Sequence, residues 1–193
     1  MALTDSGILT RNRLHPLQLG LFIACGSILM MFAALTSAYL VRQAAGNWLE
    51  FPLPSLFYVS AGVLLASSVT FQLATRAQRN WNTPLHRLLV GLTLALGLAF
   101  VLLQYAAWQT MFEDMGLPLT GNPAPSFVYV LSGLHAAHVL GGLVGLAVVT
   151  IHAFRFPAVP TPSRTLRVRL ALTYWHFMDF LWIYLLVFLA LQR

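Results

Sequence analysis

Five long apolar stretches alternate with short polar connections along the chain. An α-helix rises about 1.5 Å per residue, so about 20 apolar residues cross a hydrocarbon core of about 30 Å. The pattern therefore predicts five membrane-spanning helices. The expected spans are residues 17–41, 51–75, 88–112, 126–154 and 170–192.

The composition agrees with this pattern. Hydrophobic residues make up 59% of the 193 residues and charged residues only 8%, whereas soluble domains carry about 25% charged residues. We predict an all-α integral membrane bundle, with residues 1–193 forming a single transmembrane domain. The first apolar stretch follows Arg11 and Arg13 and is longer than a signal-peptide core, so we expect it to be a retained span.

The basic residues are all arginines and lie at or near the ends of the apolar stretches. If the N-terminus is cytoplasmic, nine arginines face the cytoplasm, and only Arg42 and Arg193 lie outside. This asymmetry follows the positive-inside rule and places the C-terminus outside. The net charge of +6 is explained by topology, and we expect no nucleic-acid partner.

Strong polar groups concentrate in the last two spans. His135 and His138 lie three residues apart in the fourth span, so they share one side of a helix. His176 and Asp179 have the same spacing in the fifth span. Small residues of the fourth span continue its histidine stripe and are expected to allow close helix packing. These are Gly141, Gly142 and Gly145.

Depth in the membrane brings these groups together. Counted from the span ends, His138 and Asp179 both lie about 12–13 Å from the cytoplasmic edge. An intramembrane acid normally faces protein or water and has a partner. We therefore predict a polar cluster of His135, His138, His176 and Asp179 between the fourth and fifth spans.

Four roles for such a cluster are compatible with the residues. Paired histidines could ligate haem b, but haem needs a wide pocket between two axial ligands. Zinc ligation or a proton relay would use the same residue types, although the three-residue spacings are not specific to either function. The fourth role is structural: the four side chains would form hydrogen bonds inside the bundle. The single cysteine, Cys25, cannot form an internal disulfide and is expected to pack as a small apolar residue.

Two stretches resemble the C-terminal signatures of subunit III of haem–copper oxidases. They are SGLHAAHVLGG at residues 132–142 and YWHFMDFLW at residues 174–182. The first span, with SAYLVR at residues 37–42, is similar to the N-terminal helix of the short, five-helix bacterial form. The resemblance covers essentially the whole chain, and the second stretch is its most specific part.

The resemblance implies a non-catalytic accessory subunit in a bacterial inner membrane. Such a subunit would hold no haem, copper or other metal, would pack on catalytic subunit I beside the other oxidase subunits, and would bind phospholipid in a cleft between helices. It would support stability and proton uptake in aerobic respiratory electron transport. The four polar residues would then be structural and not redox ligands. Six arginines could hold lipid headgroups: Arg76, Arg79, Arg87, Arg164, Arg167 and Arg169.

The chain departs from the family pattern at two places. Many relatives carry a glutamate in the middle of the first span, where residues 24–28 read ACGSI, and another shortly after the position of Gln104. A proton-buffering role is therefore in doubt here. Alternative functions are a subunit III-like protein of a nitric oxide reductase system, a haem b-binding membrane cytochrome and a small transporter. A transporter would predict internal repeats or broken helices.

Overall fold

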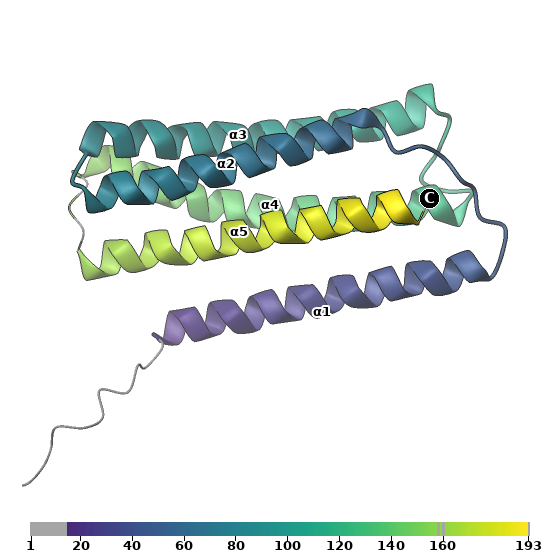
Figure 1. Ribbon diagram of the computed structural model, residues 1–193, viewed down its shortest axis with the longest axis horizontal. Coiled ribbons are helices and arrows are strands. Elements are labelled where there is room, and N and C mark those ends of the chain that lie inside the picture. The colour runs from purple at the N-terminus through teal and green to yellow at the C-terminus, as the bar shows by residue number, and fades with distance from the viewer. Residues whose placement is uncertain (1–14, 158, 160, 193) are drawn as a thin grey trace, which may run out of the picture.

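A computed structural model describes residues 15–157, 159 and 161–192, which fold as five long helices (Figure 1). All five are long and apolar enough to cross a membrane, which confirms the predicted fold class. The helices are α1 (Pro16–Ala44), α2 (Ser55–Arg79), α3 (Thr83–Gln109), α4 (Pro123–Arg155) and α5 (Pro162–Leu191). A π-helical turn, Thr110–Asp114, extends α3.

Local sequence determines where the helices begin. Proline lies in the first turn of every helix except α2, where its missing N–H costs no hydrogen bond. The Asn82 and Asn122 side chains cap α3 and α4 by accepting from backbone amides. Helix α2 begins four residues later than predicted because Pro52 and Pro54 precede it. Helix α5 begins eight residues before its apolar stretch, at Pro162.

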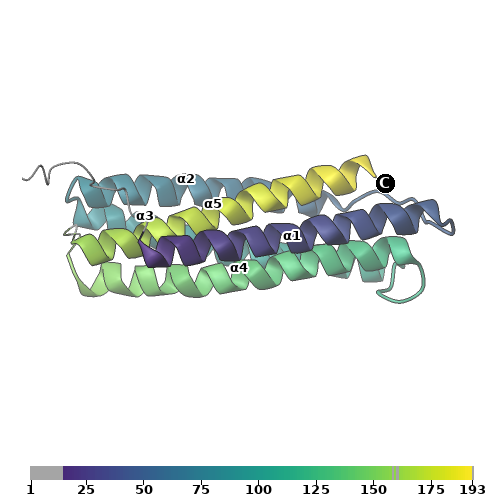
Figure 2. The ribbon, with the colours of Figure 1, turned by 90° about the horizontal axis from the view of Figure 1, so that it is seen from below.

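Helices α2 to α5 form a closed four-helix ring. In that ring α2 contacts α3, α3 contacts α4, α4 contacts α5, and α5 returns to contact α2. Helix α1 lies outside the ring and packs along the seam between α4 and α5 (Figures 1 and 2). Consequently α5 has three neighbours, and only one of them precedes it directly in the sequence.

The interior of the ring is filled with aromatic side chains, one of which packs directly against a glycine backbone. Trp175, Trp182 and Phe100 are fully or almost fully buried. The Trp175 indole N–H donates to the Ser67 hydroxyl at 2.9 Å and so joins α5 to α2. A Cβ atom at Gly97 would lie 2.9 Å from the Trp175 ring. Only glycine leaves room for the Trp175 indole against the backbone of α3.

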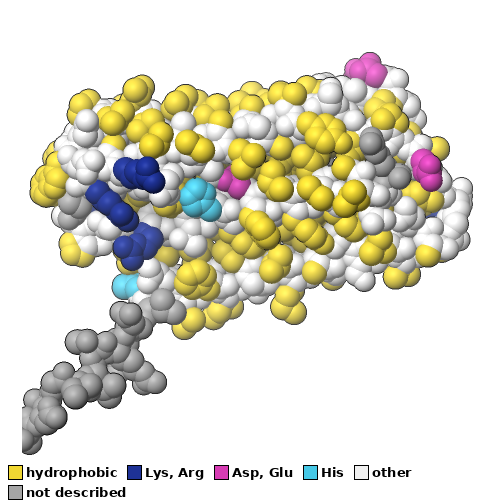
Figure 3. Space-filling view, viewed as in Figure 1, with side chains coloured by type: hydrophobic (Ala, Val, Ile, Leu, Met, Phe, Trp, Pro, Cys, Tyr) yellow, Lys and Arg dark blue, Asp and Glu magenta, His cyan; other side chains and the backbone are white. Residues whose placement is uncertain are grey.

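Charge is divided between the two ends of the bundle. We call the end where α2 and α4 stop, and α3 and α5 start, the basic end. The basic end carries Arg76, Arg79, Arg87, Arg155, Arg164, Arg167 and Arg169. The opposite end carries Glu50, Glu113 and Asp114. The face seen in Figure 3 is mainly hydrophobic between these ends. Arg11, Arg13 and Arg193 lie outside the described residues.

Candidate functional site

A polar network joins α2 and α5 at their middles. The Ser68 hydroxyl donates to an Asp179 carboxylate oxygen. Because Ser68 uses its proton there, it accepts from Nδ1 of His176 at 2.9 Å. The His176 Nδ1 atom lies 3.8 Å from the same carboxylate oxygen, and its Nε2 lies 3.3 Å from the Gln72 amide oxygen. Ser68 therefore links His176 and Asp179 of α5 to α2.

The network runs from the bundle interior to its surface. The Asp179 side chain is only 7% exposed, whereas the His176 side chain is 44% exposed. His176 is the fifteenth residue of the 30-residue α5, so its imidazole lies on the outer surface at the level where a bilayer is hydrocarbon. A polar side chain at this depth is costly when lipid surrounds it. We call the surface around it, Val69, Gln72, His176 and Phe180, the α2–α5 face.

The fourth span does not supply the partners of Asp179, which corrects the predicted position of the polar cluster. His138 uses Nδ1 to donate to the Leu134 carbonyl of its own helix at 2.7 Å. The His138 backbone carbonyl accepts from the Tyr174 hydroxyl at 3.0 Å. The physical reason is that α2 and α5 pack together to close the ring. The side of α5 that carries His176 and Asp179 therefore faces α2 and not α4.

His135 is also separate from this network. Its ring is fully buried and stacks on Trp182 with a centroid distance of 4.9 Å. Phe32 and Phe100 meet the same imidazole edge-on. Neither ring nitrogen has a hydrogen-bond partner among the described residues. These aromatic rings enclose the imidazole and leave no pocket the width of a haem beside it.

The histidine, cysteine and acidic side chains of the described residues do not gather at one place. No group of three histidine, cysteine or acidic side chains with metal-binding geometry occurs in the described part of the chain. Cys25 is buried in α1. Its neighbour along the helix, Gly26, has open space at its Cβ position, so the helix surface here is loosely covered.

The three glycines of the α4 stripe have different surroundings. A Cβ atom at Gly142 would lie 3.0 Å from the Tyr174 ring and 3.3 Å from Trp175, so this glycine does permit close packing. At Gly141 the nearest atom is 4.0 Å away, and at Gly145 nothing lies within 4 Å. The last two glycines border an open cleft and make no tight helix contact.

This cleft separates the first half of α1 from α4 and α5. It has a volume of about 510 Å³, and its walls include Leu21, Gly145, Leu170 and Tyr174. Toward the opposite end α1 is held firmly. Tyr39 packs against Trp48 and Phe188, and its hydroxyl donates to the Gln192 carbonyl at 3.1 Å. The cleft is therefore open at the basic end and closed at the other.

The six arginines proposed for lipid headgroups have four different settings. Arg87 donates to the Ala153 carbonyl at 2.8 Å and ties α3 to the end of α4. Arg79 and Arg169 line a groove between α2 and α5, and Arg76 is exposed. Arg164 and Arg167 line a separate pocket at the basic end.

Sequence reasoning missed the residues on α2 that complete the network. Ser68 and Gln72 looked like ordinary polar residues of a span, because hydroxyls and amides in lipid commonly bond to their own backbone. Gly97 also gave no signal beyond being a glycine within an apolar helix. The one available hint was the four-residue spacing of Ser68 and Gln72, which places them on the same side of a helix.

Comparison with known proteins gives a consistent result. The family model described as cytochrome c oxidase subunit III matches residues 6–191. A protein of Mycobacterium leprae named "Probable cytochrome c oxidase subunit 3" is 33% identical over 89% of this chain and 86% of its own length. The protein of the same name from Nocardia farcinica is 31% identical with the same coverage. The cytochrome c oxidase subunit 3 of Bacillus subtilis is 27% identical over 86% of this chain and 82% of its own.

Proposed function

Because the chain belongs to the cytochrome c oxidase subunit III family, the accessory subunits of terminal oxidases, we propose that it packs on catalytic subunit I through the α2–α5 face. The observation that carries this proposal is the exposed His176 imidazole halfway along α5. A neighbouring transmembrane helix would cover this ring with protein, whereas lipid would leave it against hydrocarbon. Docking on this face would support the stability of the complex and its proton uptake.

We place the chain in a bacterial inner membrane with its N-terminus in the cytoplasm. The division between a basic end and an opposite end with Glu50, Glu113 and Asp114 supports this orientation.

We also propose that haem and copper belong to the partner subunits. The chain itself would serve as scaffold and lipid holder.

We also propose that the cleft between α1 and the α4–α5 seam holds phospholipid. Its walls are mainly apolar, and Arg167 lies among the residues that line it. An acyl chain would fill the space beside Gly145, and the phosphate would stay near the basic end. Such a lipid would attach the loosely packed half of α1 to the ring.

Filling the cleft is expected to displace this lipid. Gly145→Leu places a branched side chain where nothing lies within 4 Å of the Cβ position, so the protein should fold and the cleft should shrink. We expect phospholipid retained after detergent washing to fall at least twofold, as measured by phosphorus analysis. Gly62→Leu, which also enters open space, should leave retention unchanged. Equal retention in Gly145→Leu and the wild type would refute lipid binding at this cleft.

Purification of the chain with and without its partners tests the accessory role. A tagged chain should bring down a subunit with a haem–copper absorption spectrum, identifiable by mass. The chain freed of its partners should show no Soret band. A Soret band stoichiometric with the isolated chain would favour the membrane-cytochrome alternative instead.

A further inference from the structure

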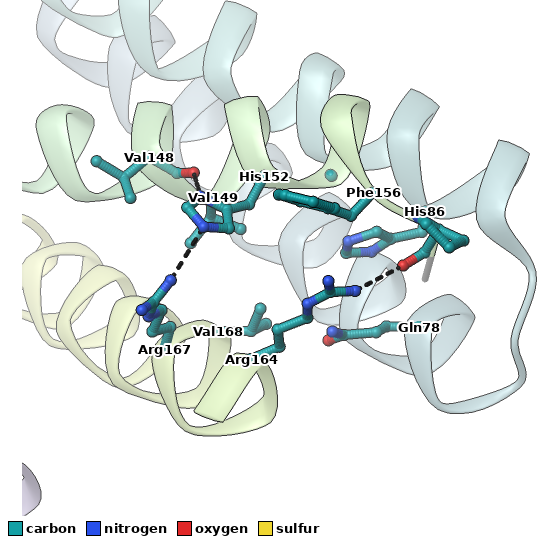
Figure 4. A pocket seen from close by; sticks show the side chains of 11 residues that line it. Gln78, His86, Val148, Val149, His152, Phe156, Arg164, Arg167 and Val168 are labelled. Atoms are coloured by element: carbon teal, nitrogen blue, oxygen red, sulfur yellow. Dashed lines mark hydrogen bonds between the residues drawn. The ribbon is translucent and has the colours of Figure 1, made fainter. Parts of the chain in front are cut away.

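A small pocket with both apolar and polar lining residues lies at the basic end, away from the α2–α5 face (Figure 4). Four helices and the α4–α5 connection enclose a cavity of about 40 Å³. Its polar wall is formed by Gln78 of α2, His86 of α3, His152 of α4, and Arg164 and Arg167 of α5. Phe156 covers one side. This arrangement sets two guanidinium groups beside buried polar groups of α2 and α3 and a half-buried histidine of α4.

The two arginines of this pocket have no acidic partner among the described residues. The Arg164 guanidinium lies 4.8 Å from the centre of the Phe156 ring and donates to the Pro157 carbonyl at 3.1 Å. Arg167 donates to Nε2 of His152 at 3.0 Å. Each guanidinium carries five N–H donors, so most of this capacity is unused. Two uncompensated positive charges at a partly enclosed site favour an anion.

Two further groups of the pocket are almost completely buried and have free hydrogen-bonding capacity. The Gln78 residue is 7% exposed and His86 is 3% exposed. His86 Nδ1 lies 2.9 Å from the Ala74 carbonyl, and because a carbonyl only accepts, Nδ1 donates and Nε2 remains an acceptor. Figure 4 shows the Gln78 amide directed toward the pocket with no bond to the residues drawn. The Gln78 amide and Nε2 of His86 are therefore available to a ligand in the pocket.

The size and chemistry of the pocket together suggest the ligand. A water-sized group needs about 10–15 Å³ of such space, so 40 Å³ holds about three to four of them, close to the oxygens of one tetrahedral anion. We propose that this pocket binds a phosphate group with a free O–H, either inorganic phosphate or a phosphomonoester. Arg164, Arg167 and the Gln78 amide would donate to its oxygens. Nε2 of His86 would accept from its O–H.

The phosphate could come from water or from lipid. The pocket opens at the basic end, where soluble phosphate has access, and Val148, Val149 and Arg167 line both the pocket and the α1 cleft. A phosphomonoester lipid, such as phosphatidic acid, could therefore place its headgroup in the pocket and an acyl chain in the cleft. The recognition chemistry is the same in both cases. It does not depend on how the chain docks on its partner.

Equilibrium binding of radiolabelled inorganic phosphate tests the proposal. The intact complex is reconstituted in phosphatidylcholine nanodiscs, whose phosphodiester headgroups carry no free O–H. We expect one saturable phosphate per chain. Arg164→Gln and Arg167→Gln should each weaken binding at least tenfold, whereas Arg169→Gln, which removes an arginine of the same helix outside this pocket, should leave it unchanged. Sulfate, which lacks an O–H near neutral pH, should compete at least tenfold less well than phosphate.

Two further arms distinguish the sources. Nanodiscs that contain phosphatidic acid should block phosphate binding to the wild type if the natural occupant is a lipid. Continued binding in those discs would support a soluble phosphate instead. The proposal is overturned if no saturable binding occurs, or if Arg169→Gln weakens binding as much as Arg164→Gln. Gln78→Leu provides a variant without any change in charge, and its failure to weaken binding would also contradict the proposed contacts.

Discussion

Replacement of Gly97 with alanine is expected to destabilise the bundle by about 1–3 kcal/mol. The added Cβ would lie 2.7 Å from Leu143 Cδ2 and 2.9 Å from Trp175 Cη2. The leucine methyl can rotate away, but the indole is 1% exposed and held by its hydrogen bond to Ser67. Helix α3 must therefore move away from the Trp175 indole, which loosens the centre of the ring.

Gly91→Ala is the matched control for this prediction. It introduces the same methyl group on the same helix, where nothing lies within 4 Å of the Cβ position. The midpoint temperature for loss of the folded peak, measured by fluorescence-detected gel filtration in detergent, should fall only for Gly97→Ala. Equal midpoints for Gly97→Ala and the wild type would show that the close packing of Trp175 on Gly97 is not needed for stability.

Removal of the Asp179 carboxylate should have a comparable effect on stability and a larger one on assembly. Asp179→Ala leaves the Ser68 hydroxyl and the His176 imidazole without their shared partner, and a buried polar group without a partner costs about 1–3 kcal/mol. One of the links between α2 and α5 is lost, so the proposed docking surface is held less firmly. We expect the variant chain to be washed out of the complex under conditions that retain the wild type.

Two controls separate this effect from a general loss of charge. Asp179→Asn keeps an acceptor of nearly the same shape for Ser68, so its loss should be smaller than that of Asp179→Ala. Asp114→Ala removes an exposed acid at the opposite end and should change stability by less than about 0.5 kcal/mol. If both substitutions at Asp179 behave like Asp114→Ala, the network contributes nothing to stability or assembly.

Much of this fold is contained in the apolar pattern itself. Five stretches of sufficient length predict five helices, because backbone groups in lipid must satisfy one another within each span. Pro52 and Pro54 shifted one boundary, and the arginine-rich turn after Pro162 extended another. Such boundaries depend on caps and interfacial turns, which a hydropathy pattern does not record.

The position of the polar network could be predicted only in part. Sequence spacing correctly placed His176 and Asp179 on one stripe of the last span. It could not show which helix that stripe faces, because ring closure by α2 and α5 joins segments more than 100 residues apart. The same limit applies to the glycines. Gly142 packs closely, while Gly145 borders a cleft, and the stripe alone does not distinguish them.

The two regions in which the family resemblance leads us to expect a glutamate have different structural settings. The first span presents Cys25 and Gly26 at the corresponding level, with open space beside Gly26. In α3, Gln104 is fully buried and donates to the Ser60 hydroxyl at 2.8 Å. Asp179 is therefore the one described acid within the middle of the bundle.

Photo-crosslinking from the α2–α5 face tests the docking proposal most directly. Phe180, which is 68% exposed on α5 beside His176, is replaced with the crosslinking residue p-benzoylphenylalanine in the assembled complex. Phe22, which is 52% exposed on α1, receives the same replacement as a matched control. We predict a product with the catalytic subunit from position 180 and none from position 22. A product from position 22 alone, or only a product with a second copy of this chain from position 180, would contradict docking through the α2–α5 face.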